Sequence, residues 1–96
     1  MNIVLIVEYQ DKFFEFQSNI EKTVRYQIEF WRELLETNPD NNKLLSLGTI
    51  ITKKIEDIDI QFKVIMKMGF NSVKFLLLYG NFLRDIVNDD AENRRV

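Results

Sequence analysis

Apolar residues recur every three or four positions along most of this 96-residue chain. That spacing places them on one face of an α-helix, which has 3.6 residues per turn. We expect three long antiparallel helices, at about residues 2–37, 41–68 and 72–88. The sequence from Asn88 onward opens with a capping residue and two acidic residues, which predicts the start of a fourth helix.

The first predicted helix carries one apolar stripe, with charged residues on the opposite face. The stripe consists of Tyr9, Phe13, Phe16, Ile20, Val24, Ile28, Trp31 and Leu35. Trp31 falls near the centre of the stripe and is expected to anchor the core. Tyr26 and Phe30 lie to one side of it, so they either contact a partner or pack on the third helix or on sequence outside this segment. A β-strand at residues 3–7 would have no second strand to pair with, so we favour a helix there.

The second predicted helix follows a turn that contains Asn38 and Pro39, because a residue before proline is pushed out of the helical region. Asp40, Asn41 or Asn42 can cap it. Its apolar positions alternate steps of four and three, which predicts nearly parallel or antiparallel helix packing. They are Leu44, Gly48, Ile51, Ile55, Ile58, Phe62, Ile65 and Gly69. We expect Phe62 to anchor the core and Gly69 to end the helix in a left-handed turn.

The third predicted helix is apolar over more than half of its circumference, so it must contact neighbours on two sides. Its centre is marked by Val73, Leu76, Gly80, Leu83 and Val87. We expect Leu76 and Leu83 to be core anchors. The candidate interaction anchors are Tyr79 and Phe82 here and Tyr26 and Phe30 on the first helix. Gly48 and Gly80 lie on apolar stripes, which predicts close helix crossings at these points.

The composition favours a protein without catalytic chemistry. Cysteine and histidine are absent, which removes thiolates, the commonest general base and the commonest zinc ligand. Ser72 is interpreted as a helix cap rather than a nucleophile. The acidic groups Glu56, Asp57 and Asp59 lack the spacing of a calcium loop and are interpreted as a solvated face. We therefore expect no enzyme activity, no catalytic residues, no metal site and no cofactor.

Charge and hydropathy also limit the partners. The net charge is −2, with acidic and basic residues mixed along the chain, so a nucleic-acid surface is not expected. The longest uncharged apolar segment runs from Phe75 to Leu83. A membrane span needs about 20 such residues, so we expect none in this segment.

Two stretches together resemble a known family. The first is Phe30-Trp31-Arg32-Glu33-Leu34-Leu35, followed by Leu44, Leu47-Gly48 and Ile51. The second runs from Asn71 to Leu83 and is closed by Val87-Asn88-Asp89. These stretches are similar to the helical segment of tiny macrocysts protein B-like proteins, which are multi-pass membrane proteins of protists and fungi that often carry PAS domains. The second stretch also resembles half-a-TPR (HAT) repeats. The resemblance implies a scaffold or sensory-linked module on the cytoplasmic side of a membrane protein, and it supplies no catalytic residues.

We therefore expect residues 1–96 to form a single all-α domain with TPR- or HAT-like packing, as part of a larger protein. Its expected function is protein–protein interaction or support within that protein, through apolar helix faces. The expected partner is protein, either the rest of a larger chain or complex or another copy. The alternative is a free-standing helical subunit that dimerises or docks into a larger assembly.

Overall fold

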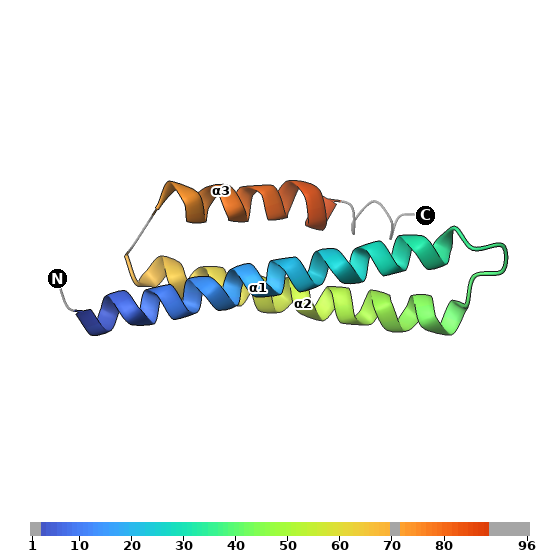
Figure 1. The fold of residues 1–96 in the computed structure, drawn as a ribbon, viewed down its shortest axis with the longest axis horizontal. Helices are drawn as coiled ribbons and strands as arrows, with labels where there is room; N and C mark the ends of the chain where they lie inside the picture. Colours follow the sequence, from blue (N-terminus) through green and yellow to red (C-terminus); the bar gives the residue numbers. More distant parts are fainter. Residues whose placement is uncertain (1–2, 70–71, 89–96) are drawn as a thin grey trace.

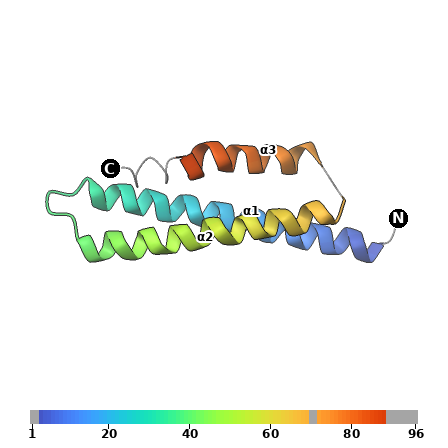
Figure 2. The ribbon, with the colours of Figure 1, turned by 180° about the vertical axis from the view of Figure 1, so that it is seen from behind.

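The computed structural model describes residues 3–69 and 72–88, and the regular structure in these ranges is helical. Helix α1 spans Ile3–Leu34, α2 spans Asn41–Lys67 and α3 spans Val73–Phe82, which continues into a π-helical turn, η1, at Leu83–Val87. Helices α1 and α2 form a long antiparallel hairpin, and α3 lies along it, antiparallel to α2 (Figures 1 and 2). The predicted all-α antiparallel fold is confirmed. The predicted fourth helix starts at Asn88, and all of its residues after Asn88 lie outside the described residues.

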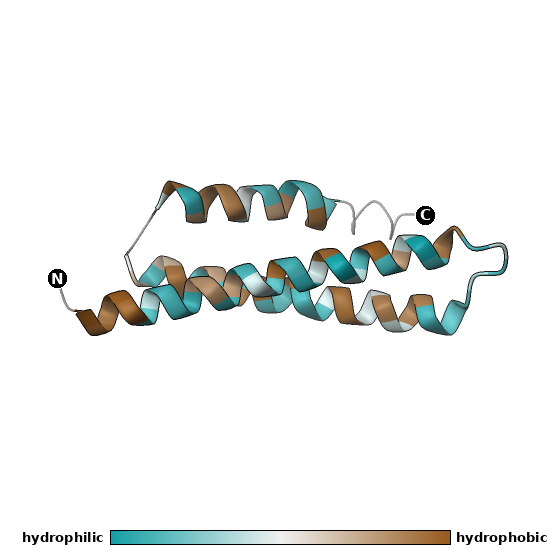
Figure 3. Cartoon of the chain, viewed as in Figure 1, coloured by the Kyte–Doolittle hydropathy of each residue, from teal (hydrophilic) through white to brown (hydrophobic). Residues whose placement is uncertain are grey.

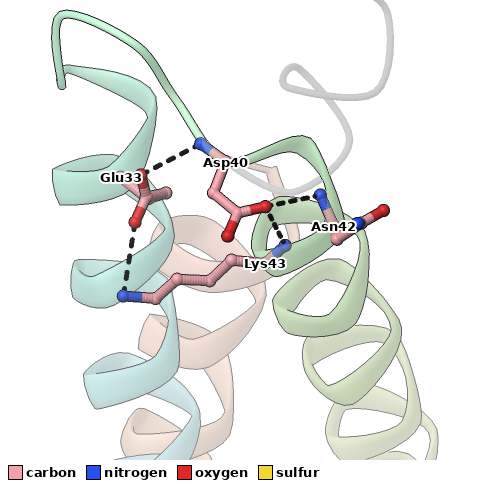
Figure 4. Close-up of polar contacts among 4 residues, drawn as sticks. All are labelled: Glu33, Asp40, Asn42 and Lys43. Carbon is pink, nitrogen blue, oxygen red and sulfur yellow. Dashed lines mark hydrogen bonds and ion pairs between the residues drawn. The ribbon is translucent and has the colours of Figure 1, made fainter.

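The turn between α1 and α2 is fixed by Glu33 and Asp40. Asp40 caps α2, because its carboxylate accepts hydrogen bonds from the backbone N–H groups of Asn42 and Lys43 at 3.0 and 3.2 Å. The Glu33 carboxylate accepts a bond from the Asp40 N–H at 3.1 Å and pairs with the Lys43 ammonium at 3.3 Å (Figure 4). These contacts close the turn, and α1 ends at Leu34 rather than near residue 37.

The core lies where the three helices meet. Its buried side chains are Phe16, Ile20, Ile58, Ile65, Phe75, Phe82 and Ile86. Phe62 is half-buried and packs against this cluster, and its ring stacks on those of Phe75 and Tyr79 at centroid distances of 5.3 and 3.6 Å. Burying one large apolar side chain contributes about 1.5–3 kcal/mol, so the phenylalanines of α3 hold that helix on the hairpin.

The prediction that Trp31 is a core anchor was wrong, since 41% of this residue is exposed. The predicted stripe takes three consecutive steps of four residues from Phe16 to Ile28. Each such step advances by about 40° around a helix of 3.6 residues per turn, so the stripe turns away from α2. Thr23 is buried in its place, and its hydroxyl donates a hydrogen bond to the Asn19 carbonyl at 2.7 Å.

Helix α3 and η1 carry two apolar seams on different sides. The inner seam, which faces the hairpin, consists of Phe75, Tyr79, Phe82 and Ile86. The outer seam consists of Val73, Leu76, Gly80, Leu83 and Val87. Figure 3 shows the hydrophobic residues in brown over much of α3, rather than in one narrow stripe.

This arrangement reverses two sequence interpretations. Leu76 and Leu83, the predicted core anchors, are 44% and 41% exposed. Phe82, a predicted interaction anchor, is 2% exposed and belongs to the core. Both seams have spacings of three and four residues, so the pattern alone cannot decide between them. The aromatic seam is the buried one because its larger rings remove more apolar area from water.

The glycines behave in two ways. Gly69 has a φ of +81°, which confirms the predicted left-handed end of α2. A Cβ atom at Gly48 or Gly80 would meet no atom outside its own helix within 4 Å. The predicted close crossings at Gly48 and Gly80 were therefore wrong within the described part of the chain.

Candidate interaction surface

Helix α3 and η1 cover only part of the hairpin. Near the start of α3, the hydroxyls of Tyr9 and Ser72 lie 3.3 Å apart. Near the end of η1, the Gln27 side-chain amide donates a hydrogen bond to the Ile86 carbonyl at 3.1 Å. Beyond Gln27 the hairpin extends to its closed end without further cover from α3 or η1 (Figures 1 and 2).

The outer seam of α3 is an exposed apolar surface. Val73, Leu76 and Leu83 all have large exposed fractions, and the adjacent Leu77 is 61% exposed. Single exposed leucines are ordinary on protein surfaces, but a continuous apolar strip along one helix indicates a contact surface. Leu77 was not a candidate from the sequence, although its place next to Leu76 on an unusually apolar helix is a signal that identifies it.

A second apolar surface runs along the last third of α1 and into the first residue of the turn. We call it the distal stripe, and it consists of Val24, Ile28, Trp31 and Leu35, all exposed. The Phe30 ring meets the Trp31 ring edge to face, with centroids 6.1 Å apart and planes at 89°. Phe30 and Tyr26 are half-buried beside this stripe. The role of these two residues as interaction anchors stays a prediction.

A hollow between α2 and the α3–η1 segment adjoins the outer seam. Its volume is about 270 Å³. The lining residues are Ile55, Glu56, Asp59, Tyr79, Phe82, Leu83 and Val87. Both charged residues in this lining are acidic, so we call the hollow the acidic groove. It combines an apolar floor with a negatively charged wall on α2.

Asp59 and Tyr79 connect the two sides of the acidic groove. The Tyr79 hydroxyl donates a hydrogen bond to the Asp59 carboxylate at 3.1 Å, and Lys63 pairs with the same carboxylate at 2.9 Å. The hydrogen bond from Lys63 is the main cause that lowers the pKa of Asp59, with Tyr79 adding to it against the effect of burial. Burial, together with the Asp59 charge, raises the pKa of Tyr79. At neutral pH the groove therefore holds an ionised Asp59 and a neutral Tyr79. Tyr79, a predicted interaction anchor, is half-buried here, and its role as an anchor stays a prediction.

The comparison with known families agrees with this architecture. Residues 1–96 match the family described as "TmcB, TPR repeats". The chain belongs to this family. Repeats of the TPR kind are helical modules that generally mediate protein–protein interaction and typically act as non-catalytic scaffolds. No curated protein and no solved structure matches the chain.

The other side-chain clusters of this TmcB TPR-repeat chain have structural explanations. The Ser72 hydroxyl caps α3 by accepting a hydrogen bond from the Phe75 N–H at 3.1 Å. Asp57 pairs with Lys53 at 3.2 Å within α2. Among the described residues, no group of three or more acidic, histidine or cysteine side chains is placed to hold a metal ion. None of the helices in that same part of the chain has the length and hydropathy needed to cross a membrane.

Proposed function

We propose that this chain is a non-catalytic interaction module that buries its exposed helix faces against other protein segments within a larger protein. The observation that carries the proposal is the exposed part of the outer seam, Val73, Leu76 and Leu83, whereas Val87 at its end packs against the core. An amphipathic helix uses one apolar stripe for its own domain. A second apolar stripe on the same helix stays in contact with water, which is unfavourable. Burial of that stripe against a partner removes this unfavourable free energy.

The resemblance to tiny macrocysts protein B-like proteins supports a finer form of the proposal. In this form the larger protein is a membrane-associated sensory protein, and the module supports it on the cytoplasmic side. The contacts would be made by the outer seam and the distal stripe, with Tyr26, Phe30 and Tyr79 at their margins. Phe82 has no part in this surface, since it lies in the core.

Site-specific photo-cross-linking in the cells that make the protein tests the proposal. A benzophenone amino acid would replace Leu76 on the outer seam or Trp31 on the distal stripe. The matched controls are Lys74 and Glu29, which are exposed on other faces of the same two helices. We expect protein adducts several-fold stronger at positions 76 and 31, with the attached peptide identified by mass spectrometry as one defined segment. Equal yields at all four positions would contradict the proposal.

A further inference from the structure

The turn η1, which continues α3, has an unusual hydrogen-bond register. The backbone N–H of Asn88 donates to the carbonyl of Leu83, five residues earlier, whereas an α-helical bond would go to Arg84, four residues earlier. Helix α3 before it keeps the α-helical register, since the Leu83 N–H reaches the carbonyl of Tyr79, four residues earlier. Single π-helical turns of this kind are rare and frequently lie at functional sites. We therefore look for the cause of the turn in the contacts around it.

The π-helical register rotates Val87 toward the core. Four residues on an α-helix advance about 40° beyond a full turn, which would place Val87 on the side of Leu83 that is away from Phe82. At about 4.4 residues per turn, the same four residues fall about 30° short of a full turn. The π turn thus carries Val87 past Leu83 to the side of Phe82. In agreement with this rotation, Val87 is half-buried and packs against the core, whereas Leu83 is 41% exposed.

Gln27 of α1 holds the backbone of this turn from the hairpin. Its side-chain amide donates a hydrogen bond to the Ile86 carbonyl, which lies within η1, at 3.1 Å. Gln27 is half-buried and Ile86 is 3% exposed, so the bond is shielded from competing water. A side chain that inserts into the hydrogen-bond ladder of a helix is one of the few causes of a local departure from α-helical geometry. Because Gln27 lies on another helix, its bond fixes this carbonyl relative to α1.

We propose that Gln27 is a positioning residue that selects the π-helical register of η1, and that an α-helical register of the same turn is its alternative state. In the alternative state the Asn88 N–H bonds to the Arg84 carbonyl, and Val87 leaves the core to extend the exposed part of the outer seam beyond Leu83. The π register gains the Gln27 hydrogen bond and the burial of Val87. The α register gains the commoner and more regular backbone geometry.

The alternative register would couple the outer seam to the hairpin. A partner shifts an equilibrium between two states only through contacts that differ between them. Val87 supplies that difference, since it joins the exposed seam only in the α register. A protein segment bound beside Leu83 should therefore favour the α register and break the bond between Gln27 and Ile86. This consequence rests on the proposed function, whereas the two registers are a property of the chain alone.

Nuclear magnetic resonance on the full 96-residue chain tests this inference. Scalar coupling across hydrogen bonds identifies the carbonyl that accepts the Asn88 N–H, which is Leu83 in the π register and Arg84 in the α register. We expect coupling to Leu83 in the wild type. Gln27→Leu removes the donor and keeps an apolar side chain, and Gln27→Glu keeps the size and replaces the donor by an acceptor. In both variants the coupling should move to Arg84, and relaxation of the Val87 methyl groups by a soluble paramagnetic agent should rise several-fold.

The matched control is Gln17→Leu, the same substitution at another half-buried glutamine of α1, which forms no hydrogen bond to η1 within the described residues. It should leave the register unchanged, and circular dichroism verifies that each variant folds. Coupling of Asn88 to Arg84 in the wild type, or to Leu83 in both Gln27 variants, overturns the inference. Loss of both couplings in the Gln27 variants also overturns it, because η1 then melts instead of changing register. The cross-linking test of the proposed function is independent of these outcomes, since its positions lie outside η1.

Discussion

The rings of Phe62 and Tyr79 stack nearly parallel across the α2–α3 interface, with centroids 3.6 Å apart and planes at 11°. The same tyrosine reaches the surface with its hydroxyl, which bonds to Asp59 one turn before Phe62 on α2. One side chain therefore joins α3 to α2 by an apolar contact inside and a polar contact at the edge. This relationship fixes which side of α3 faces the hairpin.

The stack should carry more stability than the hydroxyl. Phe62→Ala removes the ring from between Phe75 and Tyr79 and should lower the free energy of unfolding by about 2–4 kcal/mol. Tyr79→Phe keeps the ring and removes only a partly exposed hydrogen bond, so it should cost about 1 kcal/mol or less. Urea unfolding followed by circular dichroism measures both. Equal losses in the two variants would mean that the polar edge, not the stack, holds α3.

In the described part of the chain, the periodicity of the sequence was enough to predict the type and order of the three helices, because each has a long amphipathic pattern and clear turn residues. It was not enough to predict which face of α3 is buried. Leu76 and Phe75 are neighbours on two seams of equal spacing, and only the tertiary contacts with Phe16 and Phe62 distinguish them. The periodicity also did not predict that the apolar stripe of α1 turns away from α2. That turn results from the angle that accumulates over successive four-residue steps. The acidic groove brings Glu56 beside Leu83, residues 27 positions apart, so no local pattern could reveal it.

The shifted pKa of Asp59 predicts a specific acid sensitivity. The hydrogen bond from Lys63 lowers this pKa below its ordinary value of 3.8. A carboxylate with a depressed folded-state pKa stabilises the fold above its unfolded-state pKa, and that contribution is lost as the pH falls through the folded-state value. Asp59→Asn should therefore lower Tm near pH 5 and have less effect near pH 2 to 3.

Thermal unfolding over that pH range measures the effect, and Lys63→Met provides a check on its cause. Removing Lys63 takes away the main reason for the low pKa, so the wild-type acid dependence should flatten in this variant as well. The side chain of Asp59 is 43% exposed, so the contribution is small and salt-sensitive. A Tm difference between Asp59→Asn and wild type that stays constant down to pH 2 would contradict the assignment.

The α1–α2 turn should depend on the capping carboxylate of Asp40. Asp40→Ala leaves the N–H groups of Asn42 and Lys43 without their acceptor and should cost about 1 kcal/mol. Asp40→Asn retains a capping oxygen and should cost much less. Urea titration of the two variants separates the cap from the general loss of a charge, because both remove the same negative charge.

Gly80 within α3 and Gly69, which follows α2, should respond in opposite directions to alanine. Gly80 lies inside α3, and an added Cβ meets nothing within 4 Å, so Gly80→Ala should raise the free energy of unfolding by about 0.5–1 kcal/mol. Gly69 has a positive φ, so Gly69→Ala should lower stability by about 1 kcal/mol although the space around it is open. Thermal or urea unfolding of the dilute chain measures both. A destabilising Gly80→Ala would reveal a packing neighbour at this position.

The two seams of α3 can be separated by adjacent substitutions. Phe82→Ala removes a core ring that is 2% exposed and should cost about 3–5 kcal/mol, whereas Leu83→Ala removes a side chain that is 41% exposed and should cost about 1 kcal/mol or less. The pair Phe75→Ala and Leu76→Ala should show the same difference in stability about two turns earlier in the helix. Neighbouring residues lie at nearly the same point along the helix axis but on different faces, so the difference between their losses reports which face of α3 is buried. Equal losses within a pair would mean that α3 packs with a different face, and the outer seam would then no longer be free to bind a partner.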